Sequence, residues 1–405
     1  MPSNFFDAIT LADKETVQSA VIAWLFSSDC NAFTHSAKLK SLKAMFDIQE
    51  NLDHVDEIER KVEWENMDIL FILKEKSIPR YALVVENKIK CDLHDDQLNR
   101  YERVMTSKTI IRFKKDKQGC WIEKDTRIPN EYSECEHRFR YLTLLERPDL
   151  NNWGNISYGD LCQIVTDALK ESEEQKNEPD YLIVQSYLSS ITTMAEKSEE
   201  VVNKYPVKIF TNSPSEKDAY IEEYKLRHVL QVYYLRSIRQ RLIEEMAGEF
   251  MNYKLTLAQE HVWIGYGIQS DNAEIGIVIN DGPLIDKYLT FSDNKKGDFT
   301  LSFQSGTFKI AVGKDYWGKD KEANSRLLIE KRYLRSSSDA RSTVWDEYAN
   351  KNAGWKVNPP KRGYPRMAIS KRPVLSGSFD DMLVAFFKDG LRVLLTIFPL
   401  DDQIA

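Results

Sequence analysis

Two neighbouring apolar segments in the first half of the chain carry the pattern of β-strands. One contains the sequence MDIL at residues 67–70, and the other runs from residue 80 to residue 89 and ends in VVENK before Ile89. Because side chains alternate between the two faces of a strand, Val84, Glu86 and Lys88 share one face. The pattern therefore predicts two strands, the second with a carboxylate and an ammonium on the same side.

Helical spacing follows and precedes these strands. The following segment repeats every three to four residues and places Gln97 and Tyr101 on one helix face; its members are Leu93, Gln97, Tyr101 and Val104. An earlier helix begins near Glu15, and its apolar stripe consists of Val17, Ala20, Val21, Trp24 and Leu25. Helix and strand alternate from residue 10 to about residue 170, which predicts an α/β unit.

The pattern changes in the second half of the chain. Helices are expected over 181–195 and 216–250. The apolar stripe of the longer helix could pack between the two halves of the chain or form a dimer surface. From Tyr253, short apolar runs are separated by Asp, Asn, Gly and Ser, which indicates antiparallel strands; the runs are 262–268, 275–279, 299–303 and 308–312. We expect an N-terminal domain over 1–200, a helical connector over 201–252 and a C-terminal α+β accessory domain over 253–405.

Length and composition limit the class of protein. A chain of 405 residues exceeds what one hydrophobic core usually holds. No stretch approaches the roughly 20 apolar residues of a membrane span, and Met1–Thr10 shows no secretory signal. The five cysteines are widely spaced, without a Cys-x-x-Cys pair, and there is no Walker A loop or dinucleotide fingerprint. We therefore expect a cytoplasmic protein with reduced thiols and no membrane partner.

Charged residues on the two predicted strands need an explanation. Asp68 lies on the first strand, and Glu86 and Lys88 lie on the second. A strand that ends in charged residues carries them to the rim of a sheet or into a cleft. These residues could form a cross-strand ion pair, or they could form a metal site that acts on phosphodiesters.

The order and spacing of these residues resemble those of the PD-(D/E)xK nuclease superfamily. The resemblance consists of Asp68, then Glu86-Asn87-Lys88, then Gln97-x-x-x-Tyr101, and the last element is similar to that of RecB-like exonucleases. Met67 stands where the family name has proline. The resemblance covers roughly residues 10–200 and implies a restriction-endonuclease-like mixed sheet flanked by helices.

A metal site is implied by the same resemblance. Asp68 and Glu86 would hold one Mg²⁺, for which Mn²⁺ could substitute, with the main-chain carbonyl of Asn87 and water as further ligands. Glu15 could add a ligand, but a glutamate in the first turn of a helix is also favoured by the helix dipole, by about 0.3–1 kcal/mol. Oxygen ligands of this kind suit hard divalent cations.

Three further residues receive catalytic roles from this resemblance. Lys88 would lie near the attacking water or the scissile phosphate, where an ammonium stabilises developing negative charge. Gln97 would orient the water or a phosphate, and Tyr101 would support Gln97 or a backbone phosphate. The alternative for Gln97 and Tyr101 is an ordinary helix surface.

Candidate nucleic-acid contacts lie outside this cluster. The net charge of −7 argues against a protein that coats nucleic acid indiscriminately. Arg60 on the strand before Asp68 could contact a phosphate. A late basic run is interleaved with Trp355 and Tyr364 and suits phosphate contacts and base stacking, although it also fits a solvated loop. Its candidate contact residues are Lys356, Lys361, Arg362 and Arg366.

The sequence thus predicts a metal-dependent nuclease that hydrolyses phosphodiester bonds, most readily those of DNA, with RNA not excluded. The resemblance implies a bacterial defence or repair setting, with a homodimer or a defence-system protein as a further partner. The alternative is a catalytically silent nucleic-acid-binding or assembly subunit that keeps the nuclease-like fold. Intact Asp68, Glu86 and Lys88 favour the nuclease.

Overall fold

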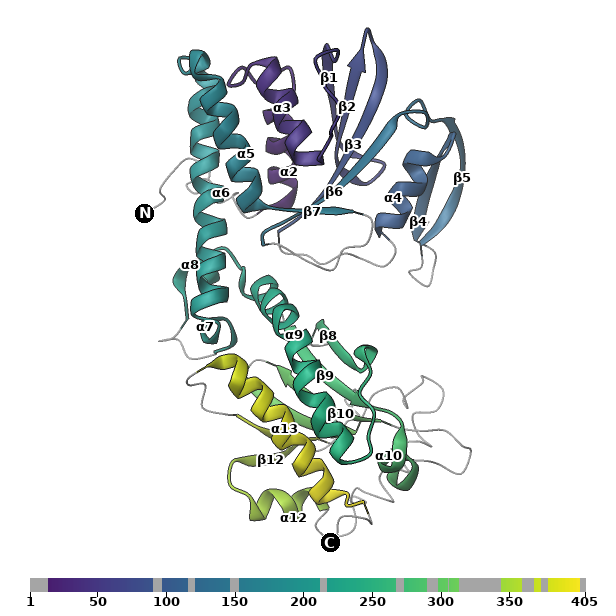
Figure 1. Ribbon diagram of the computed structural model, residues 1–405, viewed down its shortest axis with the longest axis vertical. Helices are drawn as coiled ribbons and strands as arrows, with labels where there is room; N and C mark the ends of the chain where they lie inside the picture. Colours follow the sequence, from purple (N-terminus) through teal and green to yellow (C-terminus); the bar gives the residue numbers. More distant parts are fainter. Residues whose placement is uncertain are drawn as a thin grey trace. The chain divides into compact units, whose positions relative to one another are not determined.

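The chain forms two compact units, Met1–Glu200 and Val201–Ala405, in a computed structural model (Figure 1). The structure describes residues 14–89, 97–115, 121–145, 153–211, 217–266, 273–289, 298–304, 306–312, 344–358, 368–372 and 378–400.

A five-stranded mixed sheet is the centre of the first unit. Its strand order is β1-β2-β3-β6-β7; β1, β2 and β3 are antiparallel, whereas β6 pairs in parallel with both β3 and β7. The strands of this unit are β1 (Glu57–Trp64), β2 (Met67–Glu75), β3 (Ile78–Lys88), β4 (Thr109–Lys115), β5 (Trp121–Pro129), β6 (Glu136–Thr143) and β7 (Gly154–Ser157).

Helices cover both faces of this sheet, so the predicted mixed α/β sheet flanked by helices is confirmed (Figure 1). The helices are α2 (Glu15–Leu25), α3 (His35–Phe46), α4 (Gln97–Thr106), α5 (Tyr158–Glu171), the 3₁₀ helix η1 (Glu173–Gln175) and α6 (Pro179–Lys204). Leu93, which the pattern assigns to α4, lies outside the described residues.

The alternation of side chains along β2 and β3 separates two apolar layers. Leu70 and Val84 belong to a core cluster with Tyr101 and Val104 of α4. Phe71 points to the opposite face, where its ring meets that of Phe26 at the end of α2, with the centroids 6.1 Å apart. Both faces are buried, which explains why these strands read as nearly continuous apolar runs.

A two-stranded hairpin, β4–β5, follows α4. Its first strand carries a basic run in which Arg112 and Lys114 alternate with apolar residues, the pattern of a half-exposed strand. One of these, Arg112, forms an ion pair with Glu65, with Nη2 and Oε1 2.9 Å apart. Part of the basic character of this segment is therefore neutralised within the unit.

A six-stranded antiparallel sheet is the centre of the second unit, with strand order β12-β13-β11-β10-β9-β8. The strands are β8 (Val262–Tyr266), β9 (Ala273–Ile279), β10 (Phe299–Gln304), β11 (Thr307–Val312), β12 (Trp355–Asn358) and β13 (Ala368–Lys371). The helices are α7 (Val207–Phe210), α8 (Ala219–Glu223), α9 (Arg227–Asn252), η2 (Gln259–His261), α10 (Gly282–Tyr288), α12 (Val344–Lys351) and α13 (Phe379–Ile397).

Two long helices pack on this sheet. Helix α9 contacts β8 and β9, and α13 contacts β10 and β11 as well as α9. The pattern assigns α9 to a connector, whereas here it lies in the same compact unit as the strands. The predicted helix over 216–250 is interrupted, because Lys225 adopts a left-handed conformation with φ 53° between α8 and α9.

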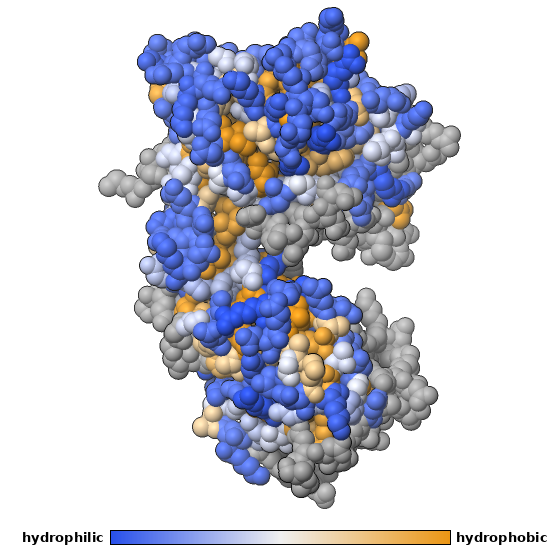
Figure 2. Space-filling model, viewed as in Figure 1, coloured by the Kyte–Doolittle hydropathy of each residue, from blue (hydrophilic) through white to orange (hydrophobic). Residues whose placement is uncertain are grey.

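Hydrophilic residues cover most of the visible surface of each unit (Figure 2). The exposed large apolar side chains are scattered, with Leu182 and Met251 the most exposed among the described residues, as is usual for a folded protein. None of the described helices is sufficiently long and apolar to span a bilayer.

Two helical glycines are expected to respond oppositely to substitution by alanine. A Cβ at Gly390 in α13 would lie 2.5 Å from the ring of Phe308, whereas a Cβ at Gly248 in α9 would meet nothing within 4 Å. Helix propensity favours alanine by about 1 kcal/mol at both sites, but overpacking costs about 1–3 kcal/mol at position 390. Gly390→Ala should lower, and Gly248→Ala should raise, the free energy of unfolding in urea. Stabilisation by both substitutions would contradict the close packing at Gly390.

Candidate active site

Asp68, Glu86 and Lys88 come together at one end of the antiparallel pair β2–β3. The register pairs Ile69 with Val85, so the next residues along the ladder are Asp68 and Glu86. The period of two directs these side chains to the face of the sheet that α4 covers. The sheet thus gathers three charged groups beside an otherwise apolar layer.

The carboxylate of Glu86 is fully buried. Its Oε1 lies 2.7 Å from Nζ of Lys88, and it accepts a hydrogen bond of 2.6 Å from Nε2 of Gln97. Its other oxygen, Oε2, is buried and has no hydrogen-bond partner. A buried carboxylate oxygen without a partner is costly to fold, so this atom marks a place for a ligand.

Gln97 and Tyr101 hold this carboxylate from the side of α4. Nε2 of Gln97 lies 2.7 Å from the hydroxyl of Tyr101, and that hydroxyl donates to the main-chain carbonyl of Asn66. The ring of Tyr101 packs against Trp153, with centroids 6.3 Å apart. The chain of contacts fixes the orientation of Glu86.

Asn87 links the two faces of the sheet. Its main-chain N–H donates to Oδ2 of Asp68 at 2.7 Å. Its buried side chain points to the opposite face, where Nδ2 donates to Oγ of Ser19 at 3.1 Å and Oδ1 accepts from the hydroxyl of Tyr158 at 3.0 Å. The side chain of Asn87 is therefore structural, and its main-chain carbonyl is the only group that it could offer a metal.

Glu15 reaches the end of β3 from the first turn of α2. Its Oε1 accepts a hydrogen bond of 2.9 Å from the main-chain N–H of Ile89. It is also close enough to Asp68 and Glu86 to raise the pKa of each. Among the described residues, three carboxylates and the ammonium of Lys88 thus share this region.

Burial and mutual repulsion control protonation in this cluster. Burial, and then the charge of Asp68, raise the pKa of Glu86 to about 7. Burial also raises the pKa of Asp68, against the attraction of Lys88. Burial opposes the charge of Lys88, but the neighbouring Glu86 and Asp68 outweigh it and raise its pKa. Lys88 is therefore charged at neutral pH, whereas Glu86 is close to its titration point.

A comparison with protein families identifies the first unit. Residues 3–189 match the family model described as the PD-(D/E)XK nuclease superfamily. This region of the chain belongs to the PD-(D/E)XK nuclease superfamily. Searches of curated proteins and of solved structures found no match to the chain. The mixed sheet flanked by helices agrees with the restriction-endonuclease-like fold that the sequence predicts.

Membership of the PD-(D/E)XK superfamily points to a nuclease activity and to divalent metal ions. The site fits such an ion in three respects: two carboxylates repel each other, Oε2 of Glu86 has no partner, and the available donors are hard oxygens. Among the described residues, however, no three His, Cys, Asp or Glu side chains are grouped to hold a metal. An ion here would need Asp68, Glu86 and further ligands from the main chain or water.

Two of the five predicted nucleic-acid contacts lie within the described residues, one in each unit. Arg60 on β1 forms an ion pair with Asp29, with Nη2 and Oδ2 3.0 Å apart. Lys356 is exposed on β12 in the second unit. Lys361, Arg362 and Arg366 lie outside the described residues.

Ser19 and Tyr158 are supporting residues that the sequence argument does not assign. Ser19 lies one helical turn after Glu15 and donates to its main-chain carbonyl at 2.8 Å. Tyr158 opens α5, 71 residues after Asn87 in the chain. Helical spacing could indicate Ser19, but the contact of Tyr158 depends on the tertiary fold.

The pKa of Glu86 predicts how the stability of the metal-free protein depends on pH. Because the folded protein binds this proton more tightly than the unfolded chain, stability falls as the pH rises from about 4.5 to about 7, by up to about 3 kcal/mol. Glu86→Gln keeps an acceptor for Lys88 and Gln97 but cannot titrate. Its unfolding free energy, measured in urea with chelator, should therefore rise relative to wild type across this window. If the unfolding free energies of wild type and Glu86→Gln changed with pH in parallel, the pKa of Glu86 would not be raised.

Proposed function

We propose that this protein is a metal-dependent nuclease that hydrolyses phosphodiester bonds in DNA. The observation that carries the proposal is the buried Glu86, whose unpartnered oxygen lies in a cluster with Asp68 and Lys88. A structural ion pair alone would not account for two carboxylates that repel each other beside a free oxygen. The superfamily of residues 3–189 supports the same activity.

The charge balance of the site suits an anionic substrate only when a cation is present. A divalent ion between Asp68 and Glu86, Mg²⁺ in our proposal, would supply the positive charge that neutralises the phosphodiester and its transition state. Without it, Glu15, Asp68 and Glu86 would repel a phosphate. The carboxylates therefore bind the ion, and substrate binding follows from that.

Lys88 is the residue to which we assign direct contact with the attacking water and the scissile phosphate. Its ammonium is held 2.7 Å from Oε1 of Glu86, and its side chain is 12% exposed. From there it would orient the attacking water and stabilise the charge that develops on the phosphate. Glu86 keeps the ammonium charged, because it raises the pKa of Lys88.

Gln97 and Tyr101 are assigned to positioning. Gln97 donates to the same oxygen of Glu86 that Lys88 contacts, so Oε2 remains the free atom. Tyr101 fixes Gln97 and is itself tied to the carbonyl of Asn66. This arrangement preorganises the carboxylate before an ion arrives.

The proposed setting is a bacterial defence or repair system in the cytoplasm. It follows from the sequence resemblance alone. A partner protein, or a second copy of the chain, would then direct the nuclease to its target.

The test incubates purified wild-type protein with supercoiled plasmid, linear duplex, single-stranded DNA and RNA. Each reaction contains Mg²⁺, Mn²⁺ or chelator, and products are separated by gel electrophoresis. We expect wild type to cleave DNA in the presence of metal and chelator to abolish this cleavage. If only RNA is cleaved, the assigned substrate is RNA instead of DNA. Cleavage that persists in chelator would contradict the proposed chemistry. If no substrate is cut, calorimetry with Mg²⁺ and Mn²⁺ decides, since absence of metal uptake would indicate a silent subunit.

A further inference from the structure

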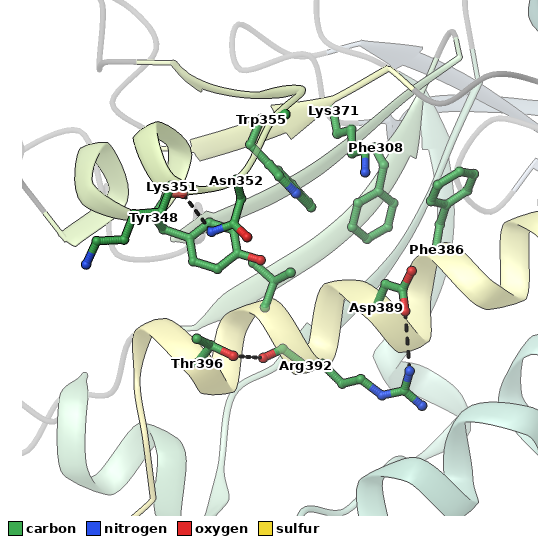
Figure 3. Close-up of a pocket in the computed structure, with 12 residues that line it drawn as sticks. Phe308, Tyr348, Lys351, Asn352, Trp355, Lys371, Phe386, Asp389, Arg392 and Thr396 are labelled. Atoms are coloured by element: carbon green, nitrogen blue, oxygen red, sulfur yellow. Dashed lines mark hydrogen bonds and ion pairs between the residues drawn. The ribbon is translucent and has the colours of Figure 1, made fainter.

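A cavity of about 440 Å³ lies in the second unit, between α12, the strands β11 to β13 and α13. Figure 3 shows the rings of Tyr348, Trp355 and Phe308 around a space above α13. Its volume lies within the range of about 300–1,000 Å³ that is usual for small-molecule sites. The active-site residues do not contribute to it.

Trp355 presents an aromatic surface in this cavity. The rings of Tyr348 and Phe308 meet it nearly at right angles, at 75° and 79°, with centroids 6.2 and 6.5 Å away. Among the described residues, no ring stacks in parallel on Trp355. Trp355 is half-buried, so packing holds it while part of it stays accessible.

Basic side chains border the same cavity. Lys351, Lys371 and Arg392 line it together with a single acid, Asp389. Arg392 is paired with Asp389 and with Glu249. Lys351 and Lys371 make no ion pair within the described residues, and Nζ of Lys371 lies 6.0 Å from the ring centroid of Trp355. The lining thus combines a partly open aromatic wall with positive charge.

We infer that this cavity binds one unpaired nucleotide, with the base on Trp355 and the phosphate near Lys371. The side chain of Lys351 points away from Trp355 (Figure 3). Bases stack on aromatic side chains whatever their sequence, and the ammonium group complements the phosphate. The nucleotide is part of a single strand, an assignment that rests on the proposed function; a free nucleotide shares the same chemistry and is an arm of the test.

Two variants and one matched control test this site in the full chain. Trp355→Ala removes the stacking surface, whereas Thr396→Trp fills the cavity and leaves its walls in place. Lys388→Gln removes a charge from α13 at a residue that is paired with Glu245 and does not line the cavity. Circular dichroism melting curves check that each variant folds.

Binding is measured in chelator, by fluorescence anisotropy with a labelled single-stranded oligonucleotide and by calorimetry with deoxyadenosine monophosphate. We expect both cavity variants to weaken binding about tenfold, as loss of one stacked base does, and Lys388→Gln to bind as wild type. If the oligonucleotide binds more tightly than the monophosphate, the ligand of the cavity is a nucleotide within a single strand. If the monophosphate binds more tightly, the ligand is a free nucleotide.

Three outcomes overturn the inference: wild type binds neither ligand, the folded cavity variants bind like wild type, or Lys388→Gln loses as much affinity as they do. Cleavage of linear duplex by wild type with Mg²⁺ is measured in parallel. Cleavage without cavity-dependent binding refutes the cavity alone. Cavity-dependent binding without cleavage and without uptake of Mg²⁺ or Mn²⁺ in calorimetry refutes the proposed nuclease alone.

Discussion

Lys88→Ala is expected to lower the rate of DNA cleavage by about 10²–10⁴-fold, the range for loss of a positioned proton-transfer or charge-stabilising group. The ammonium is the only basic side chain shown in contact with Glu86 in the described part of the chain. Its removal leaves the carboxylates without their counter-charge but leaves the apolar layers of β2 and β3 intact. The measurement is the single-turnover rate on linear duplex with saturating Mg²⁺.

Lys74→Ala is the matched control. Lys74 lies on β2 of the same sheet and is paired with Glu57 and Glu59, each 2.8 Å from its ammonium. Its loss removes an ion-paired lysine far from Asp68 along the strand. Equal cleavage by a folded Lys88→Ala protein and by wild type would remove Lys88 from the mechanism.

Asp68→Asn is expected to reduce cleavage by about 10³-fold or more, because several kcal/mol of charge stabilisation depend on the bound ion. Asparagine has the same shape and can still accept from the N–H of Asn87, so the strand ends remain joined. The loss of one negative ligand should also abolish the Mg²⁺ uptake that calorimetry detects in wild type.

Glu63→Gln controls for charge at this site. Glu63 is exposed and near enough to raise the pKa of Asp68. Its neutralisation should leave both cleavage and Mg²⁺ uptake nearly unchanged. If Asp68→Asn and Glu63→Gln lost cleavage and Mg²⁺ uptake to a similar extent, metal binding would depend on the overall negative potential of the site and not on direct ligation by Asp68.

Strand periodicity was sufficient to predict β2, β3 and the shared face of Glu86 and Lys88, whereas the mixed sheet was implied by the family resemblance. The period of two is a local property, and both strands are buried along most of their length. The contact between Gln97 and Glu86 is different, because it depends on how α4 packs across the sheet. Only the resemblance to a known family could indicate it.

Other features have no local signal. The direction of the Asn87 side chain follows from strand alternation, but its partners Ser19 and Tyr158 come from two distant helices. Strands β12 and β13 have only four residues each, one of them lysine, and lie in a basic stretch of the chain, so the sequence fits a solvated loop equally well. The break before α9 depends on the left-handed Lys225, a residue type without preference for that conformation.

Because Asn87 lies between Glu86 and Lys88 in the chain, residues on the opposite face of the sheet affect the candidate active site. The side-chain amide of Asn87 is hydrogen-bonded to Ser19 of α2 and to Tyr158 of α5, whereas the neighbouring residues Glu86 and Lys88 face the candidate active site. A substitution that disturbs the helical layer would therefore misplace Glu86 and Lys88 without touching either. In a random-mutagenesis screen, inactive clones should consequently cluster on the far side of the sheet, around Ser19 and Tyr158, as well as at the charged residues.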